Sequence, residues 1–158
     1  MKSFDNTEER VYQAVQYFHS GYNCAQSVFL AYADLFDVDP EMAKKMTVSF
    51  GGGMGRMREV CGTVSAMAML AGFRYPADPQ DKESRTRNYG MVQKMAGLFK
   101  EKHGSIICRE LLAEKAAKQT DPTPSDRTPQ YYSTRPCGRL VEESARIAAR
   151  MLKGELES

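Results

Sequence analysis

The chain of 158 residues is long enough for one domain with its own hydrophobic core. Hydrophobic residues make up 42% of it and charged residues 27%, which is typical of a globular protein. The formal net charge of +2 gives no polybasic surface for nucleic acid. Residues 1–10 carry acidic side chains and no apolar run, so they do not resemble a signal peptide, and the uncharged stretch 60–73 is too short to span a bilayer. We therefore expect one cytoplasmic domain over residues 1–158, without a nucleic-acid or membrane partner.

Apolar residues recur at helical spacing in the first third of the chain, and strand patterns are nearly absent. A first helix is expected between a capping box at Asp5–Glu8 and Gly21. A second begins after Asn23 as its N-cap, and a third begins at residues 39–41, where Pro40 takes the first helical position. The run 50–56, Phe-Gly-Gly-Gly-Met-Gly-Arg, then interrupts the helical pattern.

Further helices are expected in the rest of the chain. The most apolar one covers residues 59–71, a long amphipathic one ends at Gly104, and Ser105 caps the helix after it. Residues 120–136 contain four prolines and are expected to be irregular, either as a functional loop over the site or as a connection that wraps around the domain. A last helix covers residues 136–152. The prediction is an all-α, single-domain bundle of about six helices with a Pro-rich connection before the last helix.

Four cysteines lie far apart in the sequence, each in the first turn of an expected helix. Unpaired N–H groups and the helix dipole at such a position favour the thiolate, which is the form that attacks disulfides and binds metals. Burial as a small apolar residue would explain any one of them, but four similar placements favour a functional thiol site. The candidate catalytic and metal-ligating residues are Cys24, Cys61, Cys108 and Cys137.

Basic residues lie next to three of these four cysteines, and nearby cations lower the pKa of a thiol. They are Arg56 and Arg58 before Cys61, Arg109 after Cys108, and Arg135 and Arg139 around Cys137.

The spacing of the cysteines contains no C-x-x-C motif, so any shared site must be assembled by the tertiary fold. Four cysteines match the ligand count of an iron–sulfur cluster or of a tetrahedral zinc site, and they equally match two dithiol/disulfide pairs. The spacing does not decide between these chemistries. A zinc site that only ties helices together, and an enzyme with one reactive cysteine, stay open as alternatives.

The glycine-rich run lacks the lysine of a phosphate-binding loop and the third glycine of a dinucleotide fingerprint, so it does not indicate a nucleotide site. The glycines allow left-handed turns and close helix approach, or else they bring backbone N–H groups near a thiolate as an anion nest. Gly52, Gly53, Gly55 and Arg56 are the candidate cofactor-binding residues. His19 and His103 fall at expected helix ends, where capping is a more common role than ligation.

Several segments together resemble one known family. They are Gly-Tyr-Asn-Cys-Ala-Gln at 21–26, the glycine run at 50–56, Glu-Val-Cys-Gly at 59–62 and Gly-Ser-Ile-Ile-Cys-Arg-Glu-Leu-Leu at 104–112. The family is the bacterial and archaeal C_GCAxxG_C_C family of proposed redox-active proteins. The resemblance implies a small helical protein whose four motif cysteines form a redox or metal-binding centre. Thr63 and Ala66 depart from the small residues of the family pattern.

The sequence thus predicts a redox or electron-transfer protein that acts with an unidentified redox partner. Its cysteines would hold an iron–sulfur cluster or zinc, or would cycle between dithiol and disulfide, and the apolar helix faces leave room for a homodimer.

Overall fold

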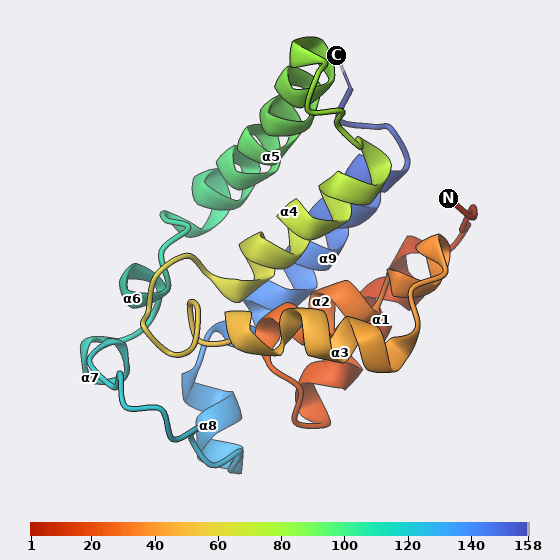
Figure 1. Ribbon diagram of the computed structural model, residues 1–158. Coiled ribbons are helices and arrows are strands. Elements are labelled where there is room, and N and C mark those ends of the chain that lie inside the picture. Colours follow the sequence, from red (N-terminus) through yellow and green to blue (C-terminus); the bar gives the residue numbers. More distant parts are fainter. Residues whose placement is uncertain (158) are drawn as a thin grey trace.

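The structure is a computed structural model that describes residues 1–157, and within that range its regular elements are all helical apart from one isolated bridge. Helices α4 and α9 lie side by side at the centre, with α5 along one side and α1 and α2 on the other (Figure 1). The predicted all-α bundle is confirmed. The main helices are α1 (Thr7–His19), α2 (Cys24–Leu30), α4 (Gly62–Arg74), α5 (Lys82–His103) and α9 (Cys137–Leu152).

Shorter helices connect the long ones. Helix α3 packs on α2, while α6, α7 and α8 lie at one end of the molecule near the loop of residues 50–60 (Figure 1). Residues 1–157 hold nine α-helices, which is roughly consistent with the predicted bundle of about six; the short α7 and α8 add to the number because a helix of one turn or two leaves little periodic pattern. The short elements are α3 (Pro40–Thr47), α6 (Cys108–Leu111), α7 (Glu114–Ala117), α8 (Pro129–Thr134) and two 3₁₀ turns, Ala33–Phe36 and Val48–Phe50.

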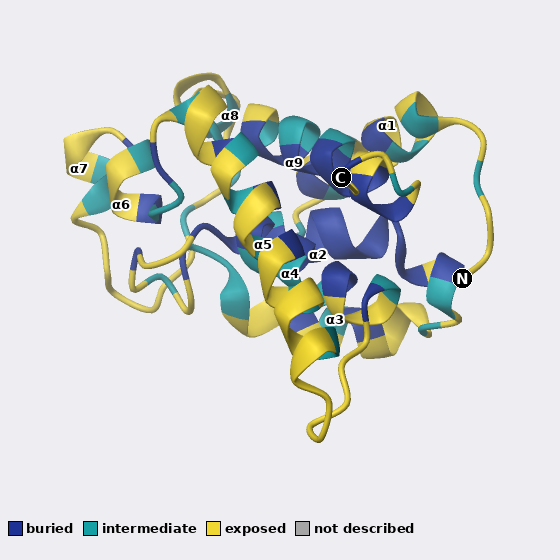
Figure 2. Ribbon diagram, turned by 90° about the horizontal axis from the view of Figure 1, so that it is seen from above, coloured by how far each residue is buried: buried dark blue, intermediate teal, exposed yellow. Residues whose placement is uncertain are grey.

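Helix α9 is the central element of the core. It packs against α1, α2, α4 and α5, and its inward face is almost wholly buried (Figure 2). Each neighbour contributes large apolar side chains to the same core, and their burial is the main favourable contribution to folding. Examples are Phe18 of α1, Phe29 of α2, Leu70 of α4, Phe99 of α5 and Val141 of α9 itself.

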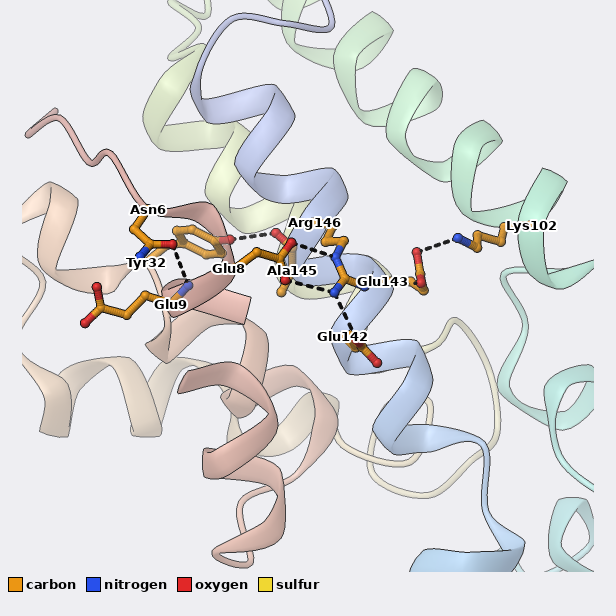
Figure 3. A network of polar contacts seen from close by, with 9 residues as sticks. All are labelled: Asn6, Glu8, Glu9, Tyr32, Lys102, Glu142, Glu143, Ala145 and Arg146. Atoms are coloured by element: carbon orange, nitrogen blue, oxygen red, sulfur yellow. Dashed lines mark hydrogen bonds and ion pairs between the residues drawn. The ribbon is translucent and has the colours of Figure 1, made fainter. Parts of the chain in front are cut away.

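Polar contacts fix the neighbours of α9 in position. The buried Tyr32 hydroxyl donates to the Ala145 carbonyl at 2.6 Å, and Arg146 binds both carboxylate oxygens of Glu8 at 3.1 and 3.0 Å (Figure 3). On the other side, Lys102 of α5 donates to Glu143 at 2.8 Å. The ion pairs are largely exposed and contribute little stability, so their main effect is on orientation.

Two helix starts differ from the prediction. Asn6, and not Asp5, caps α1, because the Asn6 side chain accepts the backbone N–H of Glu9 at 3.1 Å. The apolar helix α4 begins at Gly62 and not at Glu59. The reason is that residues 59 and 60 are extended, with Val60 in an antiparallel bridge to Ile107.

The Pro-rich connection also differs from the prediction. Residues 120–136 are not wholly irregular, because Thr128 caps α8 by accepting the N–H of Tyr131 and Pro129 takes the first helical position. Helix α6 begins at Cys108, and Ser105 lies before it, accepting the N–H of Ile107 at 3.0 Å.

The apolar helix α4 also ends later than predicted, at Arg74 and not at residue 71, whereas several other helix ends agree with the prediction. Asn23 and Gln26 form a reciprocal capping box, Asp39 caps α3 ahead of Pro40, and Gly104 ends α5 in the left-handed region with φ 90°. Within residues 1–157, no helix combines the length and apolar character needed to cross a bilayer.

Replacing Tyr32 with Phe is expected to lower the free energy of unfolding by about 1 kcal/mol, because it removes a buried hydrogen bond to α9 and little packing volume. Urea unfolding followed by circular dichroism measures this difference. Tyr12→Phe is the matched control, since Tyr12 is 64% exposed, and it should change nothing. Equal effects from both substitutions would contradict the structural role given to Tyr32.

Candidate functional site

The four cysteines come together at one cavity. Cys24, Cys108 and Cys137 are the first residues of α2, α6 and α9, and Cys61 immediately precedes α4. All four line the same cavity, whose volume is about 540 Å³. Cys61 and Cys108 are buried and the other two are half-buried, and none is in a disulfide. The tertiary fold therefore gathers at one place residues that the sequence keeps far apart.

Cys24 and Cys61 lie next to each other, because a Cβ on Gly62, the residue after Cys61, would lie 2.7 Å from the sulfur of Cys24. Interaction with the Cys61 thiol, together with the backbone N–H groups of Gly52, Ala25 and Cys24, outweighs burial and lowers the pKa of Cys24 to about 6. Cys24 is thus mainly a thiolate at neutral pH.

The same interaction has the opposite effect on Cys61. Its thiol keeps its proton beside the Cys24 thiolate, so the pKa of Cys61 is raised by Cys24 and further by burial. The Thr63 hydroxyl lies 3.1 Å from the Cys61 sulfur and has a smaller effect in the opposite direction.

Cys108 and Cys137 remain thiols. Burial raises the pKa of Cys108 more than the neighbouring Arg58 lowers it, although an Arg58 amino group lies 3.8 Å from the sulfur. Burial and the negative charge of Cys24 raise the pKa of Cys137 to about 12. The expectation that adjacent arginines lower these pKa values is therefore wrong. The one cysteine with a lowered pKa, Cys24, has no arginine next to it in the sequence.

The glycine-rich run forms a left-handed turn along the cavity wall. Every residue from Gly52 to Arg56 has φ between 55° and 68°, and Arg58 follows with φ 61°. Backbone hydrogen bonds hold the turn, including Arg58 N–H to Gly52 O at 3.1 Å. Its three non-glycine members, which include Met54, each carry a cost of about 1–2 kcal/mol for this conformation. Such strain concentrates at functional sites, and here it shapes the wall beside the cysteines.

Two glycines allow the backbone to approach the cysteines closely. A Cβ on Gly53 would lie 2.6 Å from the Cβ of Cys108, and a Cβ on Gly62 would lie 2.7 Å from the sulfur of Cys24. Both distances are too short for any side chain. The close approach predicted for the glycine run is therefore observed, and the N–H of Gly52 on Cys24 adds the anion-nest contact.

The candidate cofactor-binding residues lie at or just behind the cavity wall. Gly52, Gly55 and Arg56 line the cavity, whereas Gly53 lies behind the wall against Cys108.

Residues 119–136 form the opposite wall. Arg56 donates to the Asp121 carbonyl at 2.8 Å and Arg58 to the Gln119 carbonyl at 3.1 Å, so the glycine turn and this segment are tied together. Arg127 joins the segment to the start of α2 by donating to the Tyr22 carbonyl at 3.0 Å. Arg127 also lines the cavity, and no motif in the sequence marks it.

The two histidines pack away from the thiols. His19 lies against Tyr132, with ring centroids 4.9 Å apart, and His103 lies against Phe99 at 4.7 Å. Neither is among the described residues that line the cavity.

The placement of the cysteines bears on metal binding. Across residues 1–157, no three His, Cys, Asp or Glu side chains lie close enough together to hold one metal ion. The four cysteines as placed therefore do not form the ligand shell of a tetrathiolate ion, although all four face the same cavity.

The fold is thus a helical bundle that gathers four cysteines around one cavity. The family model described as "Putative redox-active protein (C_GCAxxG_C_C)" matches residues 22–151, and the chain belongs to that family. No curated protein and no solved structure matches the chain.

Alanine at two glycines of the turn should separate backbone strain from close approach. Gly53 and Gly55 both have positive φ, but a Cβ on Gly55 would meet no atom nearer than 3.9 Å. Gly55→Ala is expected to cost about 1 kcal/mol of stability, and Gly53→Ala about 3 kcal/mol or more together with displacement of Cys108. Chemical unfolding and alkylation of Cys108 measure these effects. Similar losses in both variants would show that close approach to Cys108 does not matter.

Proposed function

We propose that this chain is a dithiol/disulfide redox protein in which Cys24 is the attacking thiolate and Cys61 is its resolving partner. One observation carries the proposal: the starts of α2 and α4 place Cys24 and Cys61 next to each other on one cavity, where the interaction between them lowers the pKa of Cys24 to about 6. A nucleophile and the group that completes its reaction are then already in contact. Membership of a family described as redox-active supports the same conclusion.

The reaction balances without any further reactant. The Cys24 thiolate attacks one sulfur of a substrate disulfide, forms a mixed disulfide and releases the other half as a thiolate. Cys61 then attacks the Cys24 sulfur, its proton passes to a released thiolate, and the second half leaves. The substrate disulfide gains two electrons and becomes one thiol and one thiolate, while Cys24 and Cys61 lose two electrons and become a disulfide.

The other two cysteines take a supporting role in this proposal. Cys108 and Cys137 line the cavity as thiols with raised pKa values, so they do not compete with Cys24 as nucleophiles at neutral pH. A dithiol partner would return Cys24 and Cys61 to the reduced state, and that partner is the unidentified redox partner that the sequence suggests.

The reactivity of Cys24 should depend on pH in a defined way. With a pKa of about 6, its alkylation rate is expected to rise through pH 6 and to level off above pH 7, where roughly nine-tenths of it is thiolate. The other three cysteines should stay slow until the pH exceeds 8. Iodoacetamide labelling, followed peptide by peptide with mass spectrometry, measures the four rates.

Two variants of Cys61 provide the control for that profile. Cys61→Ala removes the donor to Cys24 and should move the midpoint of the profile upward by about one pH unit or more. Cys61→Ser keeps a hydroxyl donor and should move it less. A midpoint near pH 8.5 in the wild-type protein would contradict the assignment of Cys24 as the thiolate.

Equilibration with reduced and oxidised dithiothreitol tests the redox couple itself. The expected product is one disulfide between Cys24 and Cys61, mapped by mass spectrometry, which is lost in Cys24→Ser and kept in Cys137→Ser. A disulfide between any other pair would refute the assignment. Iron with labile sulfide, bound in anaerobically purified protein and lost in Cys24→Ser, would replace it with a cluster function.

A further inference from the structure

The cavity contains a buried cation without a full set of partners. Arg58 is only 3% exposed, and within residues 1–157 its Nη2 atom is fully buried with no hydrogen-bond acceptor. Its Nε donates to the Gln119 carbonyl at 3.1 Å, and its Nη1 meets only the Cys108 sulfur at 3.8 Å. A guanidinium stays charged when buried, so this cation beside the cavity is left incompletely neutralised.

The charges around the cavity are all of one sign, apart from the thiolate. Arg58 shares the lining with Arg56, Arg127 and Arg135, and among the described residues no Asp or Glu lines it. The nearest carboxylate contact is that of Asp121, which lies 3.8 Å from Arg56 and is itself 62% exposed. Burial and the adjacent charge of Arg58 lower the pKa of Arg56, which shows how incompletely these cations are neutralised.

The local backbone supports a binding role for Arg58. Its φ of 61° is unfavourable for a residue with a side chain, yet the glycine turn holds it there by hydrogen bonds. Glycine at position 58 would remove that strain. An arginine kept in this conformation, in the wall of a cavity that three other arginines also line, is the arrangement expected of a preorganised anion receptor.

The rest of the lining indicates what kind of anion fits. Leu111, Leu112, Leu140 and Phe18 supply apolar surface, and a volume of about 540 Å³ is within the range of small-molecule sites. An inorganic oxyanion would leave this apolar surface empty. An organic molecule with a carboxylate can fill it while its charge meets Arg58.

We propose that the cavity binds a small organic carboxylate, with Arg58 as the primary receptor of its charge and the leucines in contact with its apolar part. We assign this ligand as the substrate, and this assignment rests on the proposed function. The substrate is then a carboxylate-bearing disulfide, one sulfur of which lies next to Cys24. Cys24 and Cys61 then reduce it as described above, and its two carboxylate-bearing halves leave as one thiol and one thiolate.

Two alkylating agents of nearly equal shape test the charge preference without any redox step. Iodoacetate carries a carboxylate and iodoacetamide a neutral amide. The measured quantity is the rate with iodoacetate divided by the rate with iodoacetamide at Cys24, and it is normalised by the same ratio for N-acetylcysteine. This normalised ratio is expected to be about ten in the wild-type protein and about one in Arg58→Gln. Arg139→Gln is the matched control and should keep the wild-type ratio, since Arg139 is exposed and outside the cavity lining. A wild-type ratio of one, or an equal fall in both variants, overturns the proposal.

A competition experiment keeps the test valid if Arg58→Gln does not fold. In the wild-type protein, benzoate should slow the iodoacetamide reaction at Cys24 and benzamide should not. Equal slowing by both compounds, or by neither, refutes the carboxylate site.

A protein that selects iodoacetate but forms no disulfide between Cys24 and Cys61 keeps the anion site and refutes the redox function. A protein that forms this disulfide but shows no charge selectivity keeps the redox function and refutes the anion site.

Discussion

The close approach of Cys24 and Cys61 is the constraint on which the rest of this cavity depends. Each sulfur acts on the other, so that the pKa of Cys24 is lowered to about 6 and the pKa of Cys61 is raised. The contact requires α4 to begin directly against the start of α2, and this is why Gly62, where a Cβ would lie 2.7 Å from the Cys24 sulfur, has no side chain. The packing of α4 against α2 and the lowered pKa of Cys24 therefore depend on the same close approach.

The glycine turn connects that pair to the rest of the site. Its left-handed backbone supplies the N–H of Gly52 to Cys24 on one side and holds Arg56 and Arg58 in the cavity wall on the other. The strain of three non-glycine residues in the turn is offset by its backbone hydrogen bonds and by the bonds of both arginines to residues 119–121. A relaxed loop would lose the anion-stabilising groups on both sides together.

The core explains why this arrangement can be held at the edge of a small bundle. Three of the cysteines begin or precede α2, α4 and α9, which pack against one another at the centre of the fold. The fourth, Cys108, is fixed by the bridge between Val60 and Ile107 and by its own N–H, which donates to the Glu59 carbonyl at 2.6 Å. Rigid helices therefore position the sulfurs, and the irregular segments supply the charged walls of the cavity.

Local signals in the sequence determined the helical class, most of the long helices and the position of each cysteine at a helix start, because capping residues, proline, glycine and apolar spacing act over a few residues. Only the tertiary structure decided which cysteine is ionised. The arginines beside Cys61, Cys108 and Cys137 suggested lowered pKa values there. Burial instead raises the pKa of Cys108 and Cys137, and the interaction with Cys24 together with burial raises the pKa of Cys61. Desolvation and long-range hydrogen bonds depend on residues distant in the chain, so neighbours in the sequence do not reveal them.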